Sequence, residues 1–207
     1  MTYAVRTVQA RCAALGFDPG PIDGIMGRRT RAAMSDATAS QGARKLPFVH
    51  PSGLSRIHIH WTAGASRTSR IDREHYHVLV EQDGSVFQEH NPTKRLAHTL
   101  NANGGAIAVS ACGMLGSTER PWNLGLYPLK ESQMFALERV VADLCVAYDI
   151  PVSRTSVLTH AEVQPTLGIK QRGKRDFDWL PGMEPGPHSP IAVGDKLRAR
   201  IAALLLS

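Results

Sequence analysis

Histidines and carboxylates in two distant fragments of the sequence have the residue types of one metal site. The first fragment, residues 56–64, contains His58 and His60. The second fragment, residues 159–179, contains His160 and two aspartates. Two neutral imidazoles and one carboxylate can hold a catalytic zinc ion and leave its fourth position open for water. The two fragments are therefore typical of a zinc-dependent hydrolase.

The first histidine pair is predicted to lie on a strand. Residues 56–61 alternate with a period of two, so His58 and His60 should point to the same face. Either histidine could bind a metal ion, or both could. Seven of the nine histidines lie between His50 and His98, which favours a site in this region without choosing its members.

Length and composition indicate a folded protein with a basic surface. The 207 residues are enough for one domain of ordinary size and a small module. The net charge of +6 suits an anionic partner such as nucleic acid, an acidic membrane or a cell-wall polymer, and charge alone does not separate these. Nucleic acid is not expected, because the basic residues are dispersed and aromatic residues make up only 6% of the chain.

Neither a membrane anchor nor a disulfide framework is expected. No apolar run reaches transmembrane length, and the first residues lack the basic and apolar regions of a secretory signal. The cysteines, Cys12, Cys112 and Cys145, are widely spaced and include no Cys-x-x-Cys pair. The sequence therefore predicts free thiols and synthesis in the cytoplasm.

The chain is predicted to divide into a small all-α module, a linker and a larger domain. Residues 1–38 carry two helices, the first ending at Gly16 and the second beginning after Gly27. Residues 39–53, rich in Ala, Ser, Gly and Pro, are the expected linker. Residues 54–207 alternate between strands and helices, which predicts an α/β domain. The predicted strands are residues 56–61, 76–80, 85–88 and 106–111, and the predicted helices of this domain are residues 130–148 and 193–205.

A set of turn and helix residues in the first module matches a known repeat. The matching residues are Val8-Gln9, Leu15-Gly16-Phe17, residues 20–24 with their Asp-Gly pair, Gly27, Thr30 and Ala33. They resemble the peptidoglycan-binding helical repeat found at one end of many wall hydrolases. Met34-Ser35-Asp36 stands where that repeat usually ends in an aromatic residue and glutamine. The resemblance implies a wall anchor; the alternative is a helical hairpin that packs on the second domain.

Five short motifs follow one another in the larger domain. They are His60-Trp61-Thr62-Ala63-Gly64; Tyr76-His77 with Asp83-Gly84; His98-Thr99 with Asn103 and Ile107-Ala108-Val109; Thr159-His160; and Gly173-Lys174-Arg175-Asp176. In this order they resemble the type-2 N-acetylmuramoyl-L-alanine amidases, a family that includes small phage lysozymes of amidase type and the animal peptidoglycan recognition proteins. The resemblance covers residues 54–182 and implies a mixed central sheet flanked by helices.

The resemblance also implies a zinc ion (Zn2+) bound by His60, His160 and Asp176. Two departures from the family pattern affect this expectation. Asp178 lies where many members continue Asp-Pro-Gly, so it is a rival to Asp176 as the third ligand. Ser110 stands where some members carry a catalytic glutamate, so that general base is absent.

Further roles are expected for residues around the implied zinc site. His58 replaces a residue that is usually apolar and could contact the site from outside the ligand set. We expect Tyr76 to position water and stabilise the intermediate, and Lys174 to stabilise the oxyanion or protonate the leaving amine. The alternatives are a core aromatic for Tyr76 and a solvated charge for Lys174. The residues expected to contact substrate are His98, Asn103 and Thr62.

The implied activity is hydrolysis of the amide bond between N-acetylmuramic acid and L-alanine in bacterial peptidoglycan, in a phage endolysin that lyses the host cell. A non-catalytic peptidoglycan-recognition protein is one alternative, but such relatives typically lack a zinc ligand and all three candidates are present here. A zinc peptidase that cuts within the stem peptide is another. The absence of a His-Glu-x-x-His motif argues against the usual zinc peptidase.

Overall fold

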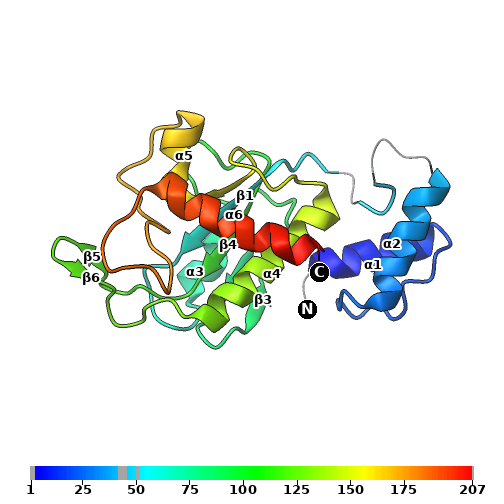
Figure 1. Ribbon diagram of the computed structural model, residues 1–207, viewed down its shortest axis with the longest axis horizontal. Helices are drawn as coiled ribbons and strands as arrows, with labels where there is room; N and C mark the ends of the chain where they lie inside the picture. The colour runs from blue at the N-terminus through cyan, green and yellow to red at the C-terminus, as the bar shows by residue number, and fades with distance from the viewer. Residues whose placement is uncertain (1–2, 42–45, 50–51, 207) are drawn as a thin grey trace.

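Among residues 3–41, 46–49 and 52–206, which the computed structural model describes, five strands form one mixed sheet (Figure 1). They are β1 (Arg56–Trp61), β2 (Val78–Val80), β3 (Val86–Gln88), β4 (Ala106–Ala111) and β7 (Val157–Thr159). Their order across the sheet is β3-β2-β4-β1-β7. Strand β3 runs antiparallel to β2, and the other neighbours are parallel. The predicted α/β fold with a mixed central sheet is therefore confirmed.

The two inner strands that the sequence predicted have the expected bounds. Strands β1 and β4 pair along their whole length, from Arg56 with Ala106 to Trp61 with Ala111. Strand β7, which the sequence analysis did not predict, lies on the other side of β1. Because β1 has parallel neighbours on both sides, the ends of three strands meet at one edge of the sheet. The sequence analysis also did not predict a separate two-stranded hairpin, β5 (Thr118–Glu119) with β6 (Trp122–Asn123).

The predicted hairpin is shorter than expected at both strands. Tyr76, expected at the start of a strand, instead caps the C-terminal end of α3 (Arg70–His75), a helix that was not predicted. This helix begins with a capping box, in which the Ser69 hydroxyl accepts from the Asp72 amide and the Asp72 carboxylate accepts from the Ser69 amide. The backbone amide of Tyr76 donates to the carbonyl of Asp72, and this bond fixes the backbone position from which the Tyr76 side chain extends.

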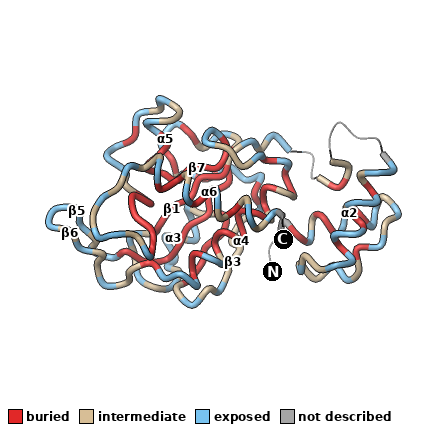
Figure 2. Tube along the Cα trace, in the orientation of Figure 1, coloured by how far each residue is buried: buried red, intermediate tan, exposed pale blue. Residues whose placement is uncertain are grey.

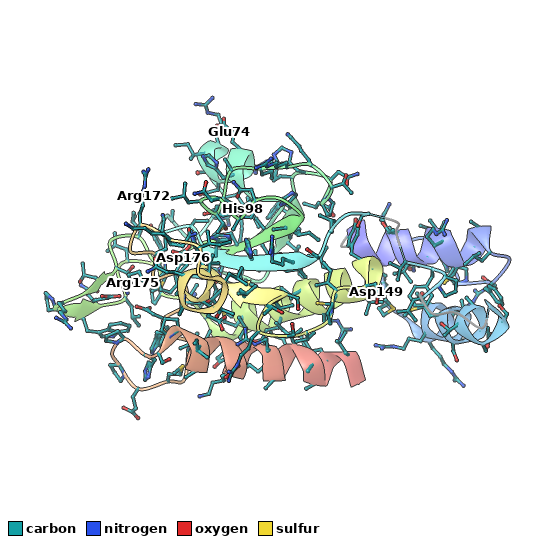
Figure 3. The ribbon with its side chains drawn as sticks, turned by 90° about the horizontal axis from the view of Figure 1, so that it is seen from above. Glu74, His98, Asp149, Arg172, Arg175 and Asp176 are labelled. Carbon is teal, nitrogen blue, oxygen red and sulfur yellow. The ribbon has the colours of Figure 1, made fainter. Side chains whose placement is uncertain are left out.

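Two long helices lie on one side of the sheet, opposite the labelled His98, while Asp176 lies at the end of the strands (Figure 3). Helix α4 (Glu131–Tyr148) buries an apolar stripe that includes Leu137 and Leu144, as its sequence period predicted. Helix α6 (Pro190–Leu206) packs on α4 and on β7. It begins earlier than the predicted residue 193, at a proline, which the first turn of a helix tolerates. The helices that flank the sheet are thus also confirmed.

The first module is a pair of helices, α1 (Tyr3–Ala14) and α2 (Arg28–Gln41), as predicted. A buried glutamine holds the turn between them. The Gln9 amide donates to the Asp23 carboxylate at 2.9 Å, and its oxygen accepts from the Gly24 amide at 2.9 Å. The Asp-Gly turn of the sequence is therefore anchored to α1. Helix α1 also packs on α4, so the module contacts the larger domain.

Burial runs without interruption from the module into the sheet. Red, buried segments follow the strands and α4 in Figure 2. Helix α1 also buries Val5, Val8 and Cys12. Helix α2 continues to Gln41, so the linker predicted for residues 39–53 begins later than expected. Residues 42–45 and 50–51 of that linker lie outside the described residues, and Phe48 is buried. The division into an anchoring module and a catalytic domain stays a prediction.

Two smaller expectations concern thiols and membrane spans. Cys12, Cys112 and Cys145 are buried free thiols, as predicted. Within the part of the chain that the structure describes, no helix has the length and apolar character needed to cross a membrane.

Candidate metal centre

Parallel strand pairing brings the two candidate histidine ligands together. His60 lies near the carboxyl end of β1, and His160 is the first residue of α5 (His160–Leu167), directly after β7. Since β1 and β7 are parallel neighbours with Ile59 opposite Thr159, both histidines emerge at the same edge of the sheet. Their ring centroids are 4.6 Å apart.

The third member of the group comes from the loop after α5. Asp176 Oδ2 lies 3.3 Å from His60 Nδ1 and 3.2 Å from His160 Nδ1. The Asp176 carbonyl accepts from the Ala161 amide at 3.2 Å, which ties this loop to the first turn of α5. One nitrogen or oxygen from each of the three side chains lies within 4.8 Å of the others, and all three residues are buried. Two imidazoles and a carboxylate at this spacing fit a catalytic zinc ion.

The far side of each histidine ring also fits metal binding. His60 Nε2 lies 3.4 Å from the Thr99 hydroxyl, and His160 Nε2 lies 3.1 Å from Gln171 Oε1. Both Nδ1 atoms therefore face Asp176, while both Nε2 atoms have partners outside the group. Ligating histidines in proteins typically bind the metal through one nitrogen and donate the other N–H to such a partner.

The surroundings of His60 and Asp176 favour the protonation states that metal ligands need. Burial lowers the pKa of His60 to about 4, although its hydrogen bond with Asp176 acts in the opposite direction. Burial by itself would raise the pKa of Asp176, but the neighbouring His160 and His60 rings hold it below the usual value. The His60 imidazole is therefore neutral and the Asp176 carboxyl ionised at neutral pH.

The rival residues lie outside this group. Asp178 Oδ2 faces Arg175 Nε at 3.3 Å, and burial raises the pKa of Asp178 to about 6 despite that guanidinium. His58 is buried on the same strand as His60, and its Nδ1 lies 3.1 Å from the Thr99 hydroxyl. Among the described residues, neither joins a group of three potential ligands. As candidate metal ligands, the geometry thus favours Asp176 over Asp178 and His60 over His58.

Of the two residues expected to take part in catalysis, Tyr76 lies beside the group and Lys174 acts on it through its charge. The Tyr76 ring centroid is 5.2 Å from that of His60. Burial raises the pKa of Tyr76 above its usual value, and the Asp176 charge adds to this, so its hydroxyl keeps its proton at neutral pH. Lys174 is exposed, two residues before Asp176, and its charge contributes to the low pKa of His60.

Ser110, the residue expected in place of the strand glutamate of some relatives, lies on β4. It lies directly opposite His60 in the β1–β4 pairing and is buried. Its hydroxyl acts on Tyr76, where it lowers the pKa against the larger effect of burial. A serine hydroxyl cannot act as a carboxylate base at neutral pH, so proton transfer must use other groups.

The three residues expected to contact substrate lie in two different surroundings. The Thr62 hydroxyl accepts from the amides of Gly64 and Gly113, both at 3.1 Å, so it shapes the turn after β1. Asn103 Oδ1 accepts from the backbone amides of His98 and Thr99. A surface cavity of about 360 Å³ is lined by Arg95, Ala97, His98, Thr99, Leu100, Asn101 and Asn103. His98 and Asn103 are therefore at a cavity next to the histidine group, whereas Thr62 does not line it.

Gln171 is the contact that sequence reasoning missed. It is a single polar residue in a basic loop without periodicity, and its partners are distant in the sequence. Thr99 was noted only as part of a motif, yet its hydroxyl lies within hydrogen-bond distance of the rings of His58, His60 and His98. Neither role leaves a signal in a single sequence.

The comparison with protein families adds a finding independent of this geometry. Residues 51–179, more than half of the chain, match the family model described as N-acetylmuramoyl-L-alanine amidase. The chain is a member of this amidase family. The family resemblance predicted from five motifs is therefore confirmed, and the matched span contains His60, His160 and Asp176. Among curated proteins, no sequence matches this amidase-family chain.

Several solved structures are similar to this member of the amidase family. The endolysin N-acetylmuramoyl-L-alanine amidase LysCS from Clostridium intestinale URNW has 16% identity and a TM-score of 0.48, covering 73% of this chain and 85% of its own. The Ph2119 endolysin from the Thermus scotoductus MAT2119 bacteriophage has 17% identity and a TM-score of 0.47, covering 77% and 95%. Drosophila peptidoglycan recognition protein SD has 17% identity and a TM-score of 0.40, covering 54% and 72%. Family membership rests on the sequence match, since these scores are below 0.5.

Proposed function

We propose that this chain is a zinc-dependent N-acetylmuramoyl-L-alanine amidase that cuts the amide bond between N-acetylmuramic acid and L-alanine in bacterial peptidoglycan. The observation that carries the proposal is the convergence of His60, His160 and Asp176, from three separate segments, on one point in an amidase-family fold. A buried neutral imidazole and an ionised carboxylate have the charge states needed to hold Zn2+.

The chemistry divides between the bound metal and the side chains. When bound, zinc supplies a Lewis acid for the scissile carbonyl and lowers the pKa of water toward about 7. Tyr76, protonated and close to His60, can donate a hydrogen bond to the attacked carbonyl oxygen or orient the water. Lys174 can stabilise negative charge on that oxygen or protonate the leaving amine. Substrate would lie along the cavity that His98 and Asn103 line.

We also propose a biological role as a phage endolysin that acts on the wall after synthesis in the host cytoplasm. Support comes from the small helical module, whose turn matches the wall-binding repeat, joined to an amidase-family domain. The basic net charge of +6 suits anionic wall or outer-membrane polymers as further contacts.

Digestion of purified peptidoglycan followed by mass spectrometry tests the proposed bond. We expect complete stem peptides that begin with L-alanine, together with glycan whose muramic acid keeps its lactyl carboxylate. Fragments cut inside the stem peptide would instead indicate a peptidase. Binding without any product would indicate a recognition protein. A parallel digestion with a chelator should lose activity, and full activity in metal-depleted protein would contradict zinc dependence.

Replacing Lys174 by alanine should lower kcat by roughly 10- to 100-fold, with zinc content unchanged. The residue cannot bind zinc while charged, so its loss should remove transition-state stabilisation and spare the metal. Kinetics on a defined muropeptide and metal analysis of the same sample measure both effects. Lys170→Ala removes another exposed lysine of the same loop and should leave kcat unchanged. An equal loss in both variants would point to general surface charge.

Replacing Tyr76 by phenylalanine tests the tyrosine hydroxyl separately. If the hydroxyl acts on the substrate, kcat should fall by roughly 10- to 100-fold, because phenylalanine keeps the ring and removes only the donor. Tyr127→Phe, in a loop outside the histidine group, is the matched control. A rate for Tyr76→Phe close to that of the unmodified protein would leave the ring only a packing role against His60.

A further inference from the structure

Gln171 is a buried glutamine whose side-chain atoms all have identified partners. Its Oε1 lies 3.1 Å from His160 Nε2. Its Nε2 donates to the carbonyl of Leu100 at 3.0 Å and to the carbonyl of Ile169 at 3.2 Å. The Gln171 backbone amide in turn donates to Gln164 Oε1 at 2.8 Å, which joins the loop to α5. The residue therefore connects His160 to two carbonyls in different loops.

These partners determine which way the amide group points. A glutamine amide has two N–H donors on nitrogen and only acceptors on oxygen. Two carbonyl oxygens on one side require the nitrogen to lie there, since the reversed orientation would place oxygen against oxygen. The Gln171 oxygen must then face His160, and it can only accept. This contact is a hydrogen bond only when His160 Nε2 carries the hydrogen.

The tautomer of His160 decides whether the ring can bind a metal at Asp176. A neutral imidazole carries one hydrogen, so an Nε2–H ring offers the Nδ1 lone pair toward Asp176. The opposite tautomer would donate Nδ1–H to Asp176 Oδ2, only 3.2 Å away, and would have no lone pair for a cation there. Gln171 and Asp176 thus compete for the same ring hydrogen, from opposite sides of the ring.

We propose that Gln171 is a positioning residue that holds His160 in the Nε2–H tautomer and so presents its Nδ1 to the metal ion. The inference rests on the proposed zinc site. Thr99, the partner of His60 Nε2, does not have the same effect. Its hydroxyl can rotate to donate or accept, and it is shared with His58 and His98. Gln171 is therefore the partner with a fixed polarity.

Two measurements on full-length protein test this role without using activity. The first is the zinc dissociation constant, by competition with a chromophoric chelator. Gln171→Leu should weaken zinc binding by roughly 10- to 100-fold, the usual effect of losing such an outer partner. The second is the 15N spectrum of the His160 ring in metal-free protein at mildly alkaline pH. We expect the Nε2–H form in the unmodified protein and a shift toward the Nδ1–H form in Gln171→Leu.

Two further variants separate polarity from loop stability. Gln171→Glu keeps an oxygen that accepts from His160 Nε2, so it should keep the Nε2–H form, even though its second oxygen then faces the carbonyls of Leu100 and Ile169. Gln164→Leu removes the bond to the Gln171 backbone without touching His160, so it should leave the tautomer unchanged. If Gln164→Leu weakens zinc binding as much as Gln171→Leu, loop stability explains the effect and the proposal is wrong.

The outcomes also distinguish this inference from the proposed function. An unmodified protein that binds no zinc would contradict the metal site itself. An unmodified protein that binds zinc, but whose metal-free His160 ring carries its hydrogen on Nδ1, would overturn only the role of Gln171. Unchanged zinc affinity in Gln171→Leu would overturn that role in the same way.

Discussion

Replacing His60 by alanine is expected to abolish peptidoglycan hydrolysis, with a fall in kcat/KM on the order of 10³-fold or more, as when a core catalytic group is removed. The substitution leaves His160 and Asp176 as the only protein ligands, and two ligands hold a catalytic zinc poorly. Zinc content should fall together with the rate, because ligand loss acts through the metal. His160→Ala and Asp176→Ala should behave in the same way. Metal analysis and muropeptide kinetics on each variant measure the two quantities.

Asp178→Asn is the matched control for these ligand variants. It changes a buried carboxyl two residues from Asp176 that faces Arg175 and lies outside the ligand group. Zinc content should therefore stay at the level of the unmodified protein. Loss of zinc in Asp178→Asn, with zinc retained in Asp176→Ala, would show that the third ligand has been assigned to the wrong aspartate.

Replacing Gly194 by alanine should destabilise the protein by about 3 kcal/mol or more, although alanine normally favours a helix interior by about 1 kcal/mol. A Cβ at this position in α6 would overlap the carboxylate of Glu162. That carboxylate is fully buried and accepts from Arg198 at 2.7 and 3.1 Å and from the Thr159 amide at 2.9 Å. Displacing it would loosen a buried ion pair and the N-terminal cap of α5, where His160 begins.

Chemical denaturation followed by circular dichroism measures this effect. Gly104→Ala is the control, because a Cβ there meets no atom within 4 Å and the backbone is not left-handed, so stability should change by less than about 0.5 kcal/mol. A Gly194→Ala protein as stable as the original would mean that Glu162 can move without cost. Weaker zinc binding in Gly194→Ala would also fit the cap of α5 holding His160 in place.

Local patterns in the sequence were enough to predict much of the scaffold. The alternation of residues 56–61 gave the bounds of β1, and residues 106–111 were predicted as a short strand with the bounds of β4. The apolar stripe from Met134 to Leu144 gave α4. Such periods reflect which side of an element is buried, and that information is local. The Asp-Gly turn of the first module was also predicted from neighbouring residues. Short elements were missed, because α3 and β7 have too few residues to show a period.

The candidate ligands were predictable only through the order of family motifs. Spacing alone did not decide whether His58 or His60 binds the metal ion, and it left Asp178 as a rival to Asp176 for the third ligand. The tertiary structure favours His60 because the register of β1 with β7 places it beside His160. It favours Asp176 because the loop after α5 returns that carboxylate to both rings, while Asp178 faces Arg175.

The sequence by itself therefore determined the fold class, the helical pair at the start and the set of residues from which a metal site could be chosen. Only the tertiary structure decided which of them meet, and it added Gln171 and the Glu162–Arg198 pair. The physical reason is the range of the interactions. Helices and strands follow from contacts a few residues apart, whereas these polar contacts join residues that are brought together only when loops and sheet edges close. An isolated residue in a loop belongs to no periodic pattern, so its distant partner cannot be predicted from the sequence.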